Sequence, residues 1–589
     1  MKESLVFRHR ERISGTRTRH WGALVLLAAA LATGCGSNGG GSNAAQGGGP
    51  GPGAGGAQAV GGSGSAGTQT VVVGGAKLTL PEGAAPIARL HKLTASEFAN
   101  SVHDLLGNDA PLSLVEPDSV VNGFASVGAL TTTMSAAGVG LYEAATGAAT
   151  DFVFSDASKA AKVLSCVPKD SADAACMKQA LTAFGRRAFR RPLTDAETTR
   201  FVTLATTIAN GAGSSSLIGM RHAVWAILQS PSFLYRSELG VASAADGGRL
   251  KYTSFEMASR LAAALWNGAP DDAVLDAAAS DSLATTDGVL TQAKRMLGDA
   301  RTHRALTAFA DDLYGVRALD EASKDPTLFP KYTLTLRKSM QQELEQRVDD
   351  LFLGSKGDFL SIYDSRSTFV NQELAAYYGV PAPSGSGFQR VELPSDSPRA
   401  GLLGAGAILS AFSLTQRTST TSRGKFVATA LLCIDIPAPP DTVKPLPAAP
   451  DTSATMRVRM TEHRTNPSCS ACHAIMDPIG FALEHFDTAA QYREQDNGKP
   501  LDTTGTLTDG SKFDGLAELG TAIRKEPIAG PCFVSKVYEN ALGRPAISLD
   551  AAAIDTLATQ FATNKNQADQ LLLGVVSSEA FRFVQPNKG

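Results

Sequence analysis

Residues 469–473, with the sequence Cys-Ser-Ala-Cys-His, carry the clearest chemical signal in the chain. This C-x-x-C-H pattern is typical of covalent haem c attachment. Two thiols three residues apart can form thioethers to both vinyl groups of one haem, and the adjacent His473 can bind the iron as proximal ligand. The sequence therefore predicts one haem c, held by Cys469, Cys472 and His473.

Two other kinds of site also use paired cysteines. A dithiol redox pair is expected after a strand in a βαβ unit, whereas Asn-Pro-Ser at 466–468 precedes this motif. A zinc site needs further ligands, which His463 and Asp477 could supply only without the standard spacing. Haem c is favoured over both alternatives.

The sequence leaves the distal iron ligand open. Met476 follows His473 by three residues, so on one helix the two would share a face and Met476 could not easily cap the opposite side of the haem. The remaining candidates are His463, His485, Met460 and Met456, or an open position. His463 ranks first because it closely precedes the motif. A strong distal ligand favours electron transfer, and an open position permits peroxide or oxygen chemistry.

The chain has seven cysteines, of which two belong to the haem motif. Cys35 is a lipidation candidate, and an even remainder in an exported chain suggests disulfides. Those four are Cys166, Cys176, Cys433 and Cys532. The first two are close in sequence and pair most plausibly, which leaves Cys433 with Cys532 by elimination.

The N-terminus has the organisation of an export signal. A basic stretch, 1–20, precedes an uncharged run, 21–32, which is too short to span a bilayer. Leu-Ala-Thr-Gly-Cys at 31–35 resembles a bacterial lipobox, with plain secretion as the alternative. The Gly/Ser-rich stretch after Cys35 is typical of a flexible tether. Gly36 rather than Asp after Cys35 favours the outer over the inner membrane.

Composition excludes several classes of protein. The 589 residues suggest three or four folded units, and 43% hydrophobic residues suffice for a core. A net charge of -3 and 6% aromatic residues argue against a nucleic-acid-binding protein. The body has no G-x-S-x-G, H-E-x-x-H or Walker motif, so serine hydrolase, zincin and nucleotide-hydrolase interpretations lack support.

The periodicity of apolar residues predicts a mainly α fold. Capping-box patterns at 94–97, 194–197 and 253–256 predict helix starts. Another long amphipathic run covers 333–353, and the Ala-rich 261–265 and 402–411 are expected in the core. Short strands or loops are predicted at 71–80, 385–393 and 499–512, and an extended proline-rich linker at 437–447.

Three charged groups could serve a site or only the surface. Arg186, Arg187, Arg190 and Arg191 could bind haem propionates, phosphate or acidic polysaccharide. A solvated helix end with intramolecular carboxylate partners is favoured instead. Asp311-Asp312 and Asp349-Asp350 are interpreted as solvated helix faces. Asp477 and Glu484 are candidates for groups that orient a haem ligand, although Asp477-Pro478 is equally typical of a turn.

The segment from His463 to Asp487 resembles large secreted proteins of myxobacteria and planctomycetes that contain domains of unknown function 1587, 1595, 1592, 1588 and 1585 in chain order. Matching motifs lie at 93–107, 184–194, 230–238 with 369–379, 401–403 with 423–425, and 533–545. A departure is Thr421-Ser422, where many members have a proline. The resemblance implies an exported cytochrome-c-like protein and supplies no established activity.

These observations predict a multi-segment helical body with a cytochrome-c-like haem-binding region near 455–495 and short β elements. The expected parts are a lipoprotein signal peptide at 1–34, a disordered tether at 35–69, helical domains at 80–150, 151–215 and 216–384, a haem-motif domain at 385–505 and a C-terminal helical domain at 506–589.

The expected function is electron transfer by a lipid-anchored protein with haem c and a redox partner protein. The body is much larger than a single haem requires. Alternatives are therefore a haem-dependent oxidoreductase acting on an extracellular or periplasmic substrate, and a surface scaffold with a structural haem.

Overall fold

The computed structural model describes residues 68–81, 89–211, 215–246, 248–437, 454–463, 465 and 467–584. All of these described residues belong to one compact unit. The expected signal peptide, Cys35 and nearly all of the tether lie outside the described residues. So do residues 438–453, which include 438–447 of the expected linker, and the side chain of His463.

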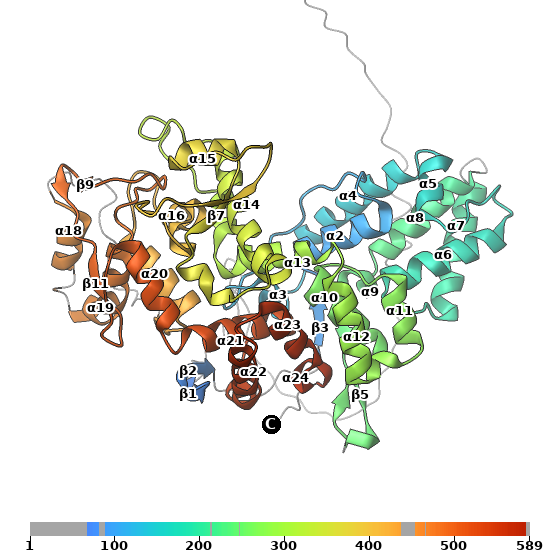
Figure 1. Ribbon diagram of the computed structural model, residues 1–589. Helices are drawn as coiled ribbons and strands as arrows, with labels where there is room; N and C mark the ends of the chain where they lie inside the picture. Colours follow the sequence, from blue (N-terminus) through green and yellow to red (C-terminus); the bar gives the residue numbers. More distant parts are fainter. Residues whose placement is uncertain are drawn as a thin grey trace, which may run out of the picture. The chain divides into compact units, whose positions relative to one another are not determined.

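The fold is mainly helical, as the sequence predicts (Figure 1). Helices begin where capping boxes were expected: the Thr94 hydroxyl accepts from the Glu97 N–H while the Glu97 carboxylate accepts from the Thr94 N–H. The same reciprocal bonds occur at 194–197 and 253–256. Such caps stabilise a helix by roughly 1 kcal/mol each.

The N-terminal core is a hydrophobic cluster formed by buried residues between 93 and 234. It is built from α2 (Ala95–Leu106), α4 (Ala136–Val153), α5 (Ala157–Val163), α6 (Ala174–Ala188), α7 (Asp195–Gly211), α8 (Ser216–Leu228) and α9 (Pro231–Leu234). Phe98 is fully buried in it and contacts Tyr142 and Phe233 edge to face. The disulfide Cys166–Cys176 joins the segment after α5 to α6.

The main core takes its residues from 73–80, 124–127 and 257–581. Its first helices are α3 (Ala125–Gly128), α10 (Ser254–Trp266), α11 (Asp272–Ala279), α12 (Thr286–Leu297), α13 (Thr302–Leu313), α14 (Leu334–Asp349) and α15 (Gln372–Tyr378). Later ones are α16 (Gly406–Ala411), α17 (Thr420–Phe426), α19 (Pro467–Phe481), α20 (Gly515–Lys525), α21 (Ala529–Leu542), α22 (Ala551–Thr563), α23 (Ala568–Ser577) and α24 (Glu579–Arg582). Helix α18 (Met456–His463) forms a separate small cluster, in which Met456 and Met460 pack with Phe481.

The described strands pair in antiparallel twos. The pairs are β1 (Thr68–Val73) with β2 (Ala76–Pro81), β3 (Arg89–Lys92) with β4 (Tyr235–Glu238), β5 (Val241–Ala242) with β6 (Leu250–Lys251), β7 (Ser367–Val370) with β8 (Gln389–Glu392), β9 (Gln495–Asp496) with β10 (Lys499–Pro500), and β11 (Thr504–Thr506) with β12 (Lys512–Asp514). The β3–β4 register, Leu90 opposite Ser237, ties the start of the N-terminal core to its end.

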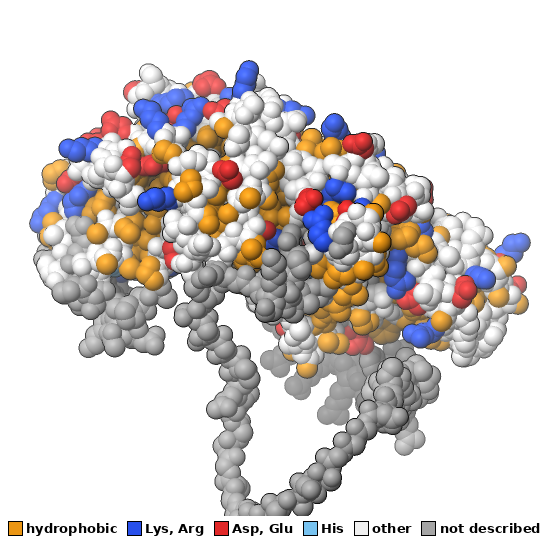
Figure 2. All heavy atoms as spheres, turned by 90° about the horizontal axis from the view of Figure 1, so that it is seen from below, with side chains coloured by type: hydrophobic (Ala, Val, Ile, Leu, Met, Phe, Trp, Pro, Cys, Tyr) orange, Lys and Arg blue, Asp and Glu red, His pale blue; other side chains and the backbone are white. Residues whose placement is uncertain are grey.

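Charged side chains of both signs are interspersed over the face shown in Figure 2. This distribution agrees with the small net charge of -3. None of the helices in the described ranges combines the length and apolar character that crossing a bilayer requires.

The paired acids at 311–312 do not form a solvated helix face, so that interpretation was wrong, whereas Asp349 and Asp350 are partly exposed. Asp311 and Asp312 are buried between α13 and its neighbours. Asp312 accepts from the Ala125 N–H at 2.9 Å and pairs with Arg317, and Asp311 accepts from the Gln341 amide at 3.1 Å. Asp349 accepts from His303. The local sequence could not show these partners, because they come from other elements.

Candidate functional site

Helix α19 presents the three residues of the C-x-x-C-H motif together. It begins at Pro467, an imino acid favoured in the first helical turn because no N–H is needed there. Positions i, i+3 and i+4 share a helix face, which places Cys469, Cys472 and His473 on one side of α19. Both thiols are outside disulfides. Cys469 is buried, and Cys472 is half-buried against the main core.

The other four described cysteines form disulfides, Cys166–Cys176 and Cys433–Cys532. This is the pairing considered from the sequence. Cys433 follows the π-helical turn at Val427–Leu431, and Cys532 lies in α21. The second disulfide therefore ties the segment before the motif to the C-terminal helices, while the two motif thiols stay available for covalent chemistry.

The imidazole of His473 contacts a buried carboxylate on its own helix. Its Nδ1 lies 3.0 Å and 3.1 Å from the two carboxylate oxygens of Asp477, one helical turn further on. The Asp477 side chain is fully buried, whereas that of His473 is 15% exposed. Asp477-Pro478 lies inside α19, so the alternative of a turn at this dipeptide was wrong.

Helix α17 packs backbone to backbone on the motif helix. A Cβ added to Gly424 would come within 2.7 Å of the carbonyl carbon of Met476, and one added to Gly480 within 2.8 Å of the Cα of Thr420. Only glycine permits this separation, so the two glycines set how closely the helices approach. The short distance also lets the Thr421 hydroxyl donate to Asp477 at 3.2 Å.

Arg423 holds the chain that leaves α19. Its guanidinium is fully buried and donates to the carbonyl oxygens of Leu409, Leu483, Phe486 and Asp487 at 2.8–2.9 Å. Burial lowers the pKa of Arg423 to about 10, so it stays charged at neutral pH. Burial also raises the pKa of Glu484, which pairs with Arg423 at 3.6 Å and with Arg493 at 2.8 Å.

Three of the four candidate distal ligands are engaged elsewhere in the described structure. Met456 and Met460 of α18 are buried against Phe481 of α19. The Nδ1 of His485 contacts the Arg493 carbonyl oxygen at 2.9 Å, and its ring stacks on Tyr492. His463 ends α18, and its side chain lies outside the described residues. Met476 lies on α19 with His473, as expected.

A groove lies beside α19, and the metal-ligating side chains near it can be compared with those that a zinc site needs. A groove of about 590 Å³ is lined by Arg457, Pro478, Phe481 and Phe513 among others, on the α18 and β11 side of the helix. Within the described ranges, no group of three or more His, Cys, Asp and Glu side chains is placed to hold a metal ion. The zinc alternative called on His463, whose side chain lies outside these residues.

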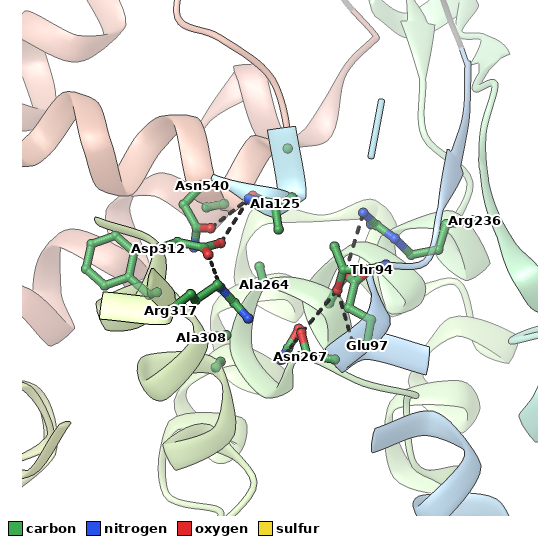
Figure 3. A pocket seen from close by; sticks show the side chains of 17 residues that line it. Thr94, Glu97, Ala125, Arg236, Ala264, Asn267, Ala308, Asp312, Arg317 and Asn540 are labelled. Carbon is green, nitrogen blue, oxygen red and sulfur yellow. Dashed lines mark hydrogen bonds and ion pairs between the residues drawn. The ribbon is translucent and has the colours of Figure 1, made fainter. Parts of the chain in front are cut away.

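A second polar pocket lies where α2, α3, α10, α13 and α21 meet (Figure 3). Its volume is about 40 Å³, enough for a few water molecules. Glu97 and Arg236 face it from one side, and Asp312 and Arg317 from the other. Each carboxylate is paired with an arginine, at 3.8 Å for Glu97 with Arg236. The pocket is thus a polar junction with balanced charges.

Two members of the arginine cluster, Arg186 and Arg191, have the carboxylate partners that the favoured interpretation expected, whereas Arg190 is buried and not solvated. Arg186 pairs with Asp272 and Asp276 of α11. Arg191 forms a bidentate ion pair with Glu197, which lowers the pKa of Glu197 to about 2. Arg187 and Arg190 donate to backbone carbonyls, at 2.6 Å to Asp104 and 2.7 Å to Phe233.

The chain matches five family models in order, each described as a protein of unknown function. These are DUF1587 over 91–154, DUF1595 over 176–238, DUF1592 over 252–380, DUF1588 over 399–496 and DUF1585 over 509–581. The chain therefore contains the five-domain set that its sequence resembles, and that resemblance is confirmed. The model over 399–496, which includes the C-x-x-C-H motif, is named PSCyt3, a cytochrome-like name. Curated proteins and solved structures give no match.

Proposed function

We propose that this chain is an exported, lipid-anchored protein that binds one haem c at Cys469 and Cys472 and passes electrons to a partner protein. The observation that carries the proposal is the motif helix itself. Two unbridged thiols and an imidazole share one face of α19, and the Nδ1 of that imidazole contacts the buried Asp477.

The donor set suits this cofactor. Thioether bonds from the two cysteines would hold the porphyrin, and the Nε2 of His473 would bind the iron, because Nδ1 is already engaged by a carboxylate. When bound, haem c supplies a one-electron couple. Helix α17, fixed against α19 by Gly424 and Gly480, would keep the proximal side rigid during electron transfer.

The proposed location rests on two supports. The lipobox-like segment ends at Cys35, which would carry the lipid and anchor the chain, with the outer membrane favoured. The described residues contain two disulfides, a feature of chains in oxidising compartments. Labelling with a radioactive fatty acid tests the anchor. The Cys35→Ser variant should take up no label and should be absent from the membrane fraction, whereas the Cys166→Ser variant should be labelled and remain in the membrane fraction.

One observation favours a second candidate, a haem-dependent oxidoreductase. Met456, Met460 and His485 make other contacts, and an iron with no strong distal ligand could bind a small molecule. Carbon monoxide separates the candidates when added to the dithionite-reduced full chain, made in a host that matures c-type haem. An unmoved Soret band supports electron transfer, and a shifted band supports the oxidoreductase. A chain without any haem band rejects both.

A further inference from the structure

A fully buried carboxylate links the motif helix to α17. The Asp477 oxygens accept from the Nδ1 of His473 at 3.0 Å and 3.1 Å, and Oδ1 also accepts from the Thr421 hydroxyl at 3.2 Å. Both contacts are made to the Asp477 side chain, which is 0% exposed. We name these three residues the Thr421–Asp477–His473 relay.

The relay fixes the protonation pattern of the imidazole. A carboxylate oxygen accepts hydrogen bonds, so the nitrogen facing Asp477 must carry the proton and Nε2 must carry the lone pair. A buried hydrogen bond of this kind draws the Nδ1 proton toward the carboxylate and makes Nε2 a stronger electron donor. Asp477 thereby increases the electron donation that His473 can give to a metal.

Thr421 acts on the same carboxylate in the opposite direction. Its hydroxyl donates to Oδ1, the oxygen that also lies 3.0 Å from the imidazole. An oxygen shared between two donors pulls less strongly on each of them. The position of Thr421 is set by the glycine contact at Gly424, three residues further along α17, so the hydroxyl cannot easily withdraw.

We infer that Asp477 and Thr421 are positioning residues that set the donor strength of His473 toward the haem iron, Asp477 by strengthening it and Thr421 by moderating it. This inference rests on the proposed haem function and deepens it. The two residues therefore have opposite effects on the reduction potential, because a stronger axial donor stabilises the oxidised iron.

The test is the midpoint potential of the haem-bearing full chain, measured by optical redox titration. Asp477→Asn should raise the potential, because an amide oxygen is a weaker acceptor than a carboxylate. Thr421→Val should lower it, because the variant keeps the shape of the side chain and removes the donor. Thr421→Ser should restore the wild-type value. Ser422→Ala, an exposed neighbour on α17, is the matched control and should leave the potential unchanged.

A second readout does not require haem. The ¹⁵N shifts of His473 in the haem-free chain should show protonated Nδ1 in the wild type and a mixture of tautomers in Asp477→Asn. If Asp477→Asn fails to fold, the Thr421→Val and Thr421→Ser pair still decides the question. If the midpoint potential shifts with the same sign in Asp477→Asn and Thr421→Val, or in neither, the inference is overturned. The proposed function still stands in that case, provided that the wild type carries haem. A wild type without haem overturns both.

Discussion

Substitution of Gly424 by alanine should separate the motif helix from α17. The new Cβ would lie 2.7 Å and 3.1 Å from the carbonyl carbon and Cα of Met476. These are backbone atoms, so no side chain can rotate away, and overpacking of this kind costs about 3 kcal/mol. Removing a helical glycine returns roughly 1 kcal/mol. The expected net loss in the free energy of unfolding is therefore about 2 kcal/mol.

The matched control is Gly140→Ala. Gly140 lies in α4, is exposed, and would meet nothing within 4 Å of an added Cβ. This variant should be more stable than wild type by about 0.5–1 kcal/mol. Urea unfolding followed by circular dichroism measures both midpoints. A Gly424→Ala variant that gains stability as Gly140→Ala does would refute the close packing of α17 on the backbone of α19.

Three other substitutions should change the free energy of unfolding. Arg423→Met should lower the free energy of unfolding by about 3–5 kcal/mol, because Glu484 and four carbonyls lose a buried partner. Burial and the nearby acids Asp311 and Asp349 raise the pKa of Glu345 from 4.5 to about 7. The folded chain therefore holds a proton there that the unfolded chain releases, and stability falls as pH rises from about 4.5 to about 7. Glu345→Gln should remove that dependence and be the more stable protein at pH 8, by roughly 1–3 kcal/mol. Finally, the loop of 99 residues closed by Cys433–Cys532 predicts a loss of about 4–5 kcal/mol in the double serine variant, against roughly 3 kcal/mol or less for the ten-residue loop of Cys166–Cys176.

Each expectation has a result that contradicts it. Arg423→Met must lose more stability than Lys425→Met, an exposed neighbour on α17; equal urea midpoints would speak against the buried partners. Parallel pH–stability curves for wild type and Glu345→Gln would show that this carboxyl does not titrate between pH 4.5 and pH 7. Equal losses for the two disulfide variants would argue against loop length as the cause.

Features decided by near neighbours could be predicted from the sequence. The helix starts at Thr94 and Thr253 follow from a hydroxyl and a glutamate three residues apart, a purely local arrangement. The motif cysteines and His473 share a helix face because their spacing is fixed by helix geometry.

Features that depend on distant segments could not be predicted. Asp312 was expected in solvent, yet it is buried, and one of its two partners is the N–H of Ala125, 187 residues away. Nothing functional was inferred from Thr421, because its contact with Asp477 appears only when α17 packs on α19. Gly424 and Gly480 are visible in the sequence, but which residues they contact is not. The approach of Gly424 to Met476 and of Gly480 to Thr420 appears only when α17 packs on α19.

Every proposal made for this chain depends on covalent attachment of haem c at Cys469 and Cys472. The most direct measurement is the intact mass of the denatured full chain, made in a host with c-type maturation, alongside the Cys469→Ser/Cys472→Ser double variant. The wild type should carry the added mass of one haem after denaturation, and the double variant should lack it. A wild-type mass equal to the bare polypeptide, or an adduct that survives in the double variant, would contradict it.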